Sequence, residues 1–98
     1  MISRHWSGTV RPEHVADYVR HLREETFPSL TDIDGFVDAT LMKRNVGSGV
    51  EFLVVTRWSS MEAIGRFAGE DPTRAVVPDK VRRWMLDFDR SVRHYEVL

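Results

Sequence analysis

The chain has 98 residues, a length typical of one domain near the lower limit for folding without disulfides or metals. It has no cysteine, which excludes disulfides and thiolate metal sites, and its net charge of −1 gives no electrostatic basis for binding nucleic acid or an anionic membrane. No segment approaches the roughly 20 apolar residues that span a bilayer, and the opening MISRHWSGTV lacks the apolar run of a signal peptide. We therefore expect a single domain over residues 1–98, located in the cytoplasm.

The first half of the chain predicts a strand, a helix and a hairpin. Residues 2–10 form the strand, and Pro12 then suits the first turn of a helix that runs to Pro28. The positions at helical spacing that face the core are Val15, Tyr18, Val19, Leu22 and Thr26. Two further strands, 36–44 and 50–58, are joined by the glycine-containing loop NVGSG.

The second half predicts two helices and a last strand. Ser59 and Glu62 form a capping box that opens the first of these helices, and Gly69 suits its left-handed end. Residues 78–89 form the next helix and residues 91–98 the last strand. The apolar residues at helical spacing in the second helix are Val81, Trp84, Met85 and Phe88. This order is a ferredoxin-like βαββαβ arrangement of the α+β class, with an extra helix before the last strand and an antiparallel four-stranded sheet covered by helices on one face.

Two strands of the predicted sheet are apolar on both sides. Leu53 and Val55 lie opposite in phase to Phe52 and Val54. In the neighbouring strand, Phe36 and Met42 are expected on one side, with Val37, Ala39 and Leu41 on the other. At ~25 cal/mol per Å², exposing several such side chains forfeits several kcal/mol. We therefore expect a homodimer in which two sheets pack face to face.

The adjacent carboxylates Glu70 and Asp71 allow three interpretations: a catalytic pair, a metal site or backbone punctuation. Gly69 closes the preceding helix, and Asp71 followed by Pro72 is typical of an N-cap and a first helical position. A metal site would need histidine or further carboxylates nearby. We interpret the pair as residues that end one helix and begin the next, in a turn that leads into the wall of a pocket.

Motifs spread over the whole chain carry a resemblance to a known family. They are W-x-G at Trp6 and Gly8, EF at Glu51-Phe52, W-x-S at Trp58 and Ser60, FAGED with AVVP within 67–78, FD at Phe88-Asp89, and HYEV at 94–97. With these motifs the chain resembles the antibiotic biosynthesis monooxygenase (ABM) domain family of dimeric α+β barrels. Within it, the chain is similar to a bacterial subgroup that carries the monooxygenase name by similarity of fold, and fold alone does not fix function.

The resemblance implies which chemistry to expect. Haem-degrading relatives use an asparagine on the first strand, a tryptophan on the helix after the third strand and an axial histidine one turn beyond. At the matching positions this chain has Trp6, Phe67 and a residue near Val76 or Val77, so haem degradation is not expected. Other relatives oxidise anthrone-like polyketides without metal or flavin, because the deprotonated substrate itself reduces O₂ in a dry pocket. We expect such a cofactor-independent monooxygenase, with no metal, acting on a hydrophobic aromatic or polyketide-like molecule.

Each candidate site residue also has a structural explanation. His94 is the expected acid or base, since an unperturbed histidine pKa of ~6.5 permits either role; the alternative is a histidine hydrogen-bonded at a strand edge or at the dimer seam. The expected substrate-binding residues, which can equally be core residues, are Trp6, Tyr18, Trp58 and Phe67. His14 and His21 are interpreted as solvated residues of a helix face, and Trp84 as packing only.

Two other functions stay open. One is a non-catalytic protein, either a small-molecule-binding or a stress-associated dimeric α+β barrel, because every candidate residue fits a structural role. The other is a lyase or isomerase in which His94 shuttles a proton. In each case the expected partners are a second copy of the chain and a hydrophobic small molecule, with neither nucleic acid nor membrane.

Overall fold

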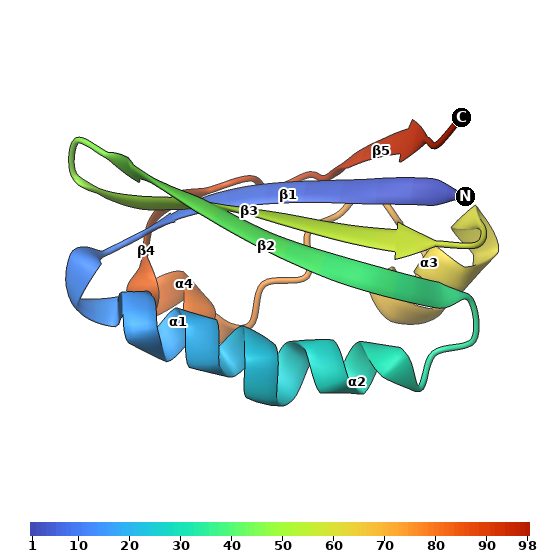
Figure 1. Ribbon diagram of the computed structural model, residues 1–98, viewed down its shortest axis with the longest axis horizontal. Coiled ribbons are helices and arrows are strands. Elements are labelled where there is room, and N and C mark those ends of the chain that lie inside the picture. The colour runs from blue at the N-terminus through green and yellow to red at the C-terminus, as the bar shows by residue number, and fades with distance from the viewer.

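The computed structural model describes all residues, 1–98, as an α+β fold of two layers (Figure 1). One layer is an antiparallel sheet of β1 (Ile2–Val10), β2 (Phe36–Val46), β3 (Gly49–Trp58), β4 (Met85–Phe88) and β5 (Arg93–Glu96). The helices α1 (Val15–His21), α2 (Phe27–Thr31), α3 (Met61–Ala68) and α4 (Asp79–Trp84) lie together on one side of it. The expected ferredoxin-like α+β fold is confirmed. None of the helices has the length and apolar character needed to cross a membrane.

The sheet has the order β2-β3-β1-β4, and β5 pairs with β1 along the same edge as β4. Gly8 pairs with Phe88, and the N–H of Asp89 still donates to the carbonyl of Ser7 at 2.8 Å. Pairing with β1 resumes at Arg93, opposite His5, so residues 90–92 leave the ladder. The expected helix over 78–89 is therefore wrong beyond Trp84, where the chain becomes extended and β4 begins. Pairing with β1 decides this, because short apolar runs fit both a helix and a strand.

The first helix does not end at Pro28, contrary to expectation. After a 3₁₀ turn at Pro12–His14 and the helix α1, Leu22–Thr26 form a π-helical turn in which the N–H of Phe27 donates to the carbonyl of Leu22. Helix α2 then continues through Pro28 to Thr31. A proline inside a regular helix lacks a donor and clashes with the carbonyl four residues earlier. The wider turn just before Pro28 changes that spacing, so the helix passes the proline.

The turns are partly as expected. The β2–β3 hairpin is tighter, because Val46 pairs with Gly49 and only two residues form the turn. Ser59 does not cap α3. Its N–H donates to the carbonyl of Gly35 at 2.7 Å, so Ser59 is still bonded to the residue that precedes β2. Ser60 is the cap, and its hydroxyl accepts a hydrogen bond from the N–H of Ala63 at 3.2 Å.

Residues 69–78 connect α3 to α4 without regular secondary structure. The Oδ1 atom of Asp71 accepts hydrogen bonds from the N–H and the hydroxyl of Thr73, at 3.0 and 2.6 Å. Asp71 therefore stabilises a turn of the backbone and has a structural role, but the prediction that it is the N-cap of a helix is wrong. The connection is fixed to the end of the chain by two backbone bonds, Ala75 N–H to Arg90 O at 3.0 Å and Val92 N–H to Thr73 O at 2.8 Å.

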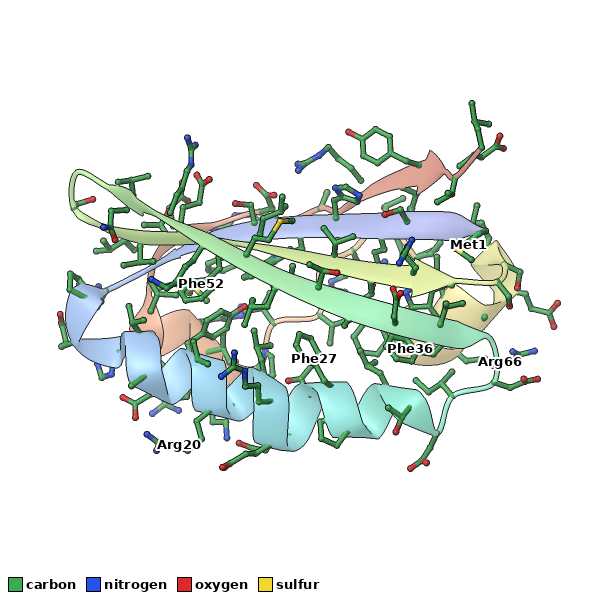
Figure 2. The ribbon with its side chains drawn as sticks, in the orientation of Figure 1. Met1, Arg20, Phe27, Phe36, Phe52 and Arg66 are labelled. Atoms are coloured by element: carbon green, nitrogen blue, oxygen red, sulfur yellow. The ribbon has the colours of Figure 1, made fainter.

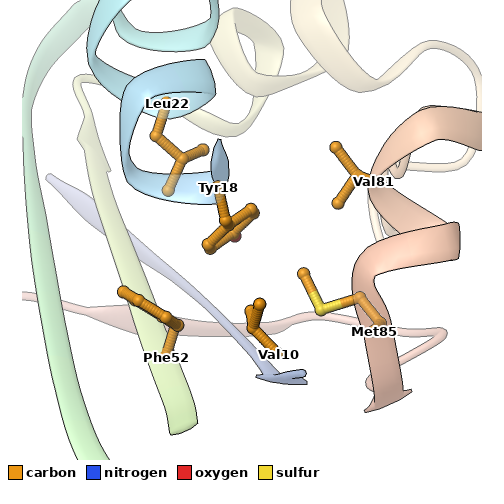
Figure 3. Packing of buried hydrophobic residues seen from close by; sticks show 6 residues of the cluster. All are labelled: Val10, Tyr18, Leu22, Phe52, Val81 and Met85. Atoms are coloured by element: carbon orange, nitrogen blue, oxygen red, sulfur yellow. The ribbon is translucent and has the colours of Figure 1, made fainter. Parts of the chain in front are cut away.

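The core consists of two clusters between the sheet and the helices. The larger contains Val10, Tyr18, Leu22, Phe52, Val81 and Met85 (Figure 3). The smaller contains Leu30, Trp58, Ala63 and Ile64. Figure 2 shows Phe27, Phe36 and Phe52 in the space between the layers, whereas Arg20 and Arg66 point to solvent. The clusters thus occupy the interior on either side of the cavity described below.

The second face of the sheet is more polar than expected. A bulge between Phe36 and Asp38 shifts the phase of β2. The expected grouping of Phe36 with Met42 is therefore wrong, and Phe36 shares the helix side of the sheet with Ala39 and Leu41. Tyr95 of β5 lies on the far face, with its ring 4.9 Å from the ring of His5. The apolar residues at the centre of this face are Met42, Leu53 and Val55. They lie between two cross-strand ion pairs, Arg57–Asp38 at 2.6 Å and Arg44–Glu51 at 2.8 Å.

Candidate functional site

A cavity of about 90 Å³ lies between the two core clusters, enclosed by the inner face of the sheet, the α1–α2 segment and the connection before α4. Of its 16 lining residues 11 are hydrophobic, so the wall is mainly apolar. The polar lining residues are Arg4, Tyr18, His21, Thr26 and Thr56. Val76 and Pro78 belong both to the lining and to the exposed surface, so the cavity meets solvent at this segment.

Arg4 on β1 is a buried cation without an anionic partner. Its side chain is on the inner face of the sheet, and the residue is only 5% exposed. Nη1 donates to the carbonyl of Pro72, and Nη2 donates to the carbonyl of Arg74 at 3.1 Å. Burial lowers the pKa of Arg4 to about 10, and no neighbouring carboxylate opposes this shift. The guanidinium therefore keeps its charge at neutral pH inside a mainly apolar wall.

His94 on β5 contacts Arg4 and is not part of the cavity wall. Arg4 Nη1 and His94 Nε2 are 3.1 Å apart. Since a guanidinium only donates, Nε2 accepts, and the ring proton of the neutral histidine lies on Nδ1. Burial, and then the charge of Arg4, lower the pKa of His94. His94 is thus a neutral acceptor that holds Arg4.

Tyr18 on α1 brings a hydroxyl to the cavity. Tyr18 is 2% exposed, and its ring packs edge-on against Phe52 with 5.0 Å between the ring centroids. Figure 3 labels both side chains in the larger core cluster. Burial raises the pKa of Tyr18 far above its usual range, so the hydroxyl stays protonated. No protein group bonds to this hydroxyl, although every polar side-chain atom sealed inside the protein has a partner. The hydroxyl therefore reaches the cavity, where it can donate or accept a hydrogen bond.

His21 lies in the cavity wall, so its interpretation as a solvated residue is wrong: it is 8% exposed. Nδ1 is 3.1 Å from Oε2 of Glu25, and Nε2 is 3.1 Å from Oγ1 of Thr26. Lys80 on α4 holds the carboxylate, with Nζ 3.0 Å from both oxygens. Hydrogen bonds from Lys80 and then from His21 lower the pKa of Glu25, which stays ionised and can only accept. In neutral His21 the proton therefore lies on Nδ1, and the lone pair of Nε2 accepts a hydrogen bond from the rotatable hydroxyl of Thr26.

The π turn brings these groups together. His21 and Thr26 are five residues apart, and side chains meet at spacings of three or four in a regular helix. In Leu22–Thr26 the backbone bonds span five residues, which puts Thr26 beside His21. A regular helix would not bring His21 and Thr26 together, so this site was not expected from the sequence. The signal that could have indicated it was Pro28 inside a continuing helical pattern.

Of the four expected substrate-binding residues, Trp6, Tyr18 and Phe67 line the cavity and Trp58 does not. The indole N–H of Trp6 donates to the carbonyl of Asp89 at 2.8 Å, which leaves its ring for apolar contact. The Phe67 ring centroid is 5.7 Å from Cζ of Arg4, a cation–π distance. Trp58 is fully buried, and its indole N–H donates to the hydroxyl of the lining residue Thr56 at 2.9 Å. No group of three or more histidine and carboxylate side chains is placed to hold a metal.

One family model matches the chain, and several solved structures share its fold. The model of the antibiotic biosynthesis monooxygenase (ABM) domain matches residues 1–79, which include all cavity-lining residues except Val81 and Val92. A protein of Deinococcus radiodurans provisionally named an antibiotic biosynthesis monooxygenase is 17% identical, with a TM-score of 0.65 over 99% of this chain and 92% of that chain. A protein of Bacillus cereus with the same provisional name is 22% identical, with a TM-score of 0.62 over 99% and 94% of the two chains.

A third structure of similar fold is an arginine-to-serine mutant of MhuD with two manganese protoporphyrin IX molecules bound per active site. It is 19% identical, with a TM-score of 0.64 over 100% of this chain and 95% of that chain. Identities this low establish a shared fold and nothing about ligand or reaction. No functionally curated protein matches the chain.

Proposed function

Because the chain belongs to the antibiotic biosynthesis monooxygenase family, we propose that it is a cofactor-independent monooxygenase that oxidises a hydrophobic aromatic or polyketide-like small molecule with O₂. The observation that carries the proposal is a mainly apolar cavity whose wall contains His21, with the exposed carboxylate of Glu25 behind its Nδ1 atom. A carboxylate behind Nδ1 orients a histidine and stabilises the imidazolium that forms when Nε2 accepts a proton. Apolar walls exclude the water that would quench reactive intermediates.

The reaction uses the substrate as the reductant. The hydroxyl of Thr26 first turns away from Nε2 of His21. His21 then removes a proton from an activated CH₂ group next to a ring, and the resulting anion transfers one electron to O₂. The substrate radical and superoxide combine to form a carbon–oxygen bond, and the peroxide takes up a proton. Loss of water from this hydroperoxide breaks the O–O bond and the second C–H bond and leaves a carbonyl. One oxygen atom enters the product, the other leaves as water, and the substrate supplies all four electrons that reduce O₂.

The proposal assigns distinct tasks to the cavity residues. His21 is the base, and Tyr18 is a hydrogen-bond donor for a substrate oxygen, which its raised pKa favours. Trp6 and Phe67 pack against the ring of the substrate. His94, the base expected from the sequence, acts here through Arg4, since Arg4 occupies its Nε2 atom.

The same proposal includes a homodimer and a location in the cytoplasm. The far face of the sheet carries Met42, 46% exposed, beside Leu53 and Val55. A second copy packed on this face would remove these side chains from water. The ion pairs Arg57–Asp38 and Arg44–Glu51 would lie at its rim.

Binding without catalysis is the second candidate, and the hydroxyl of Thr26 that occupies Nε2 of His21 favours it. The size of the cavity limits the ligand for both functions. Pockets for drug-sized ligands have volumes of roughly 300 Å³ or more. The cavity here has about 90 Å³, so a ligand of several rings fits only if the segment at Val76–Pro78 moves outward.

Oxygen uptake by chelator-treated protein distinguishes the two functions. The substrates are an anthrone and a series of one-ring and two-ring phenols, each corrected for autoxidation without protein. The proposal predicts uptake of one O₂ per carbonyl formed, well above autoxidation, for at least one compound. Binding of these compounds without any uptake above autoxidation would instead support the non-catalytic function.

A further inference from the structure

The positive charge of Arg4 is not neutralised by any group of the protein. Buried charges are normally paired with an opposite charge, because removing a charge from water is costly. The three groups that accept from Arg4 are the carbonyls of Pro72 and Arg74 and the neutral ring of His94, none of which carries a negative charge. A 5% exposed cation in a mainly apolar wall is thus left without its counter-charge.

Arg4 also has unused donors. A guanidinium has five N–H groups, and the protein accepts hydrogen bonds from three of them: two on Nη1 and one on Nη2. The N–H on Nε and one N–H on Nη2 have no protein acceptor, and Nε is not among atoms sealed from contact. Nε lies on the edge of the guanidinium that it shares with Nη2, so an acidic oxygen that reaches this edge accepts a charge-assisted hydrogen bond from the N–H of Nε.

The guanidinium is held in place before any ligand binds. Two carbonyls of the connection fix one side, and this connection is itself bonded to residues 90–92. His94 holds Nη1 from the neighbouring strand, and the ring of Phe67 lies against the guanidinium. Since the donors are fixed and the surroundings are apolar, an anion that binds here loses little to reorganisation and interacts strongly.

We propose that Arg4 is an anion-binding subsite within the cavity, which takes the acidic oxygen of a small aromatic ligand: a carboxylate, a phenolate or an enolate attached to a ring. This proposal rests on the proposed function, because it names the class of substrate that the same cavity binds. The ring lies against Trp6 and Phe67, and the charged oxygen meets the free edge of Arg4. In the monooxygenase, the subsite stabilises the electron-rich anionic form of the substrate, the form that reduces O₂.

Benzoate and benzamide test the subsite without any oxidation, because they have the same size and differ in charge. Binding is measured by calorimetry, and the position of the ring by NMR contacts to Phe67 and Val54. We expect benzoate to bind about tenfold or more tightly than benzamide. Equal affinities, no measurable benzoate binding, or contacts outside the cavity would each overturn the proposal, and none of these readouts needs a variant.

Variants then assign the preference to Arg4. Arg4→Met should remove the preference for benzoate and keep benzamide binding, whereas Arg4→Lys, which keeps the charge and donors to the carbonyls, should retain part of it. Arg23→Met is the matched control, since Arg23 is exposed on the helical segment, and it should behave like the wild type. A folded Arg4→Met or Arg4→Lys protein with the full preference would contradict the proposal. Benzoate binding through Arg4 without any oxygen uptake would support the anion subsite and contradict the monooxygenase function. Oxygen uptake without a preference for anions would support the monooxygenase function and contradict the subsite.

Discussion

Arg4 Nη1 and His94 Nε2 are 3.1 Å apart across the β1–β5 pair, so the histidine is a fixed acceptor for a buried cation. This contact connects the edge of the sheet with the cavity. The contact explains why His94 stays neutral. It also explains why His94 has no free nitrogen that could accept a proton from a substrate.

Stability should therefore fall as the solution becomes acidic, before carboxylates titrate. Burial and Arg4 lower the pKa of His94 in the folded protein, while its pKa in the unfolded chain is ~6.5. Below pH ~6.5 the unfolded chain binds more protons than the folded one, so the free energy of unfolding decreases until the lowered pKa is passed. His94→Gln, whose side-chain oxygen can accept from Arg4 but does not titrate, should flatten this dependence in urea denaturation. Because the pKa of His5 is also lowered, His5→Gln serves as the comparison, and an unchanged slope in His94→Gln would contradict the assignment.

Replacing His21 should affect the reaction rate more than binding. His21→Asn removes the base at Nε2, and we expect kcat to fall by roughly 10²–10⁴ with a much smaller change in KM. Glu25→Gln should cause a smaller loss, since it only weakens the support of the ring. His14→Asn is the control, because His14 lies outside the cavity wall. Full activity in His21→Asn would exclude it as the base.

Thr56→Val should destabilise the protein. The hydroxyl of Thr56 is the acceptor for the fully buried indole N–H of Trp58, at 2.9 Å. Leaving a buried donor unpaired costs about 1–3 kcal/mol, which chemical denaturation measures. Thr56→Ser keeps the hydroxyl and should cost clearly less, whereas a Thr56→Val protein as stable as the wild type would contradict a contribution from the hydrogen bond.

Gly8→Ala should disturb the wall formed by Trp6. A Cβ at Gly8 would lie 2.6 Å from the Cη2 atom of Trp6 and 3.2 Å from the sulfur of Met85, and the indole cannot swing away without losing its bond to Asp89. We expect a loss of about 1–3 kcal/mol in stability and a changed tryptophan fluorescence. Gly47→Ala has open space around its Cβ and should leave both unchanged.

Leu53→Glu should separate the proposed dimer. It adds a charge at the centre of the apolar strip on the far face of the sheet, where a partner would bury it. Sedimentation should give a dimer for the wild type and a monomer for Leu53→Glu. Met61→Glu, on the helix α3, should stay dimeric. A monomeric wild type at micromolar concentration would contradict the dimer.

The sequence predicted the strands and turns that depend on residues close together in the chain. The strand at residues 2–10 and the strand–strand hairpin follow from strand-forming residues bounded by proline and glycine, and they are found at or near the expected bounds. β4 was not predicted, because pairing with β1 and not local spacing decides its conformation. The continuation through Pro28 depends on a π turn, which leaves no simple periodic signal.

The polar part of the site was largely missed. The alternation of ISRHWSGTV puts Arg4 in phase with Trp6 and Val10, so an arginine on the buried face of a strand was visible in the sequence. Its lack of a counter-charge was not visible, because that depends on the connection of 69–78 and on His94. His21 looked like a surface residue because a helical pattern does not show what packs against it, here Trp84 at 6.0 Å between ring centroids.

Incubation of chelator-treated protein with ¹⁸O₂ and an anthrone or phenol substrate is the decisive experiment for the proposed oxidation. We expect a product that contains one ¹⁸O atom in its new carbonyl, formed at a rate that His21→Asn strongly reduces. A product without ¹⁸O, or one formed no faster than in the absence of the protein across the substrate series, would contradict it.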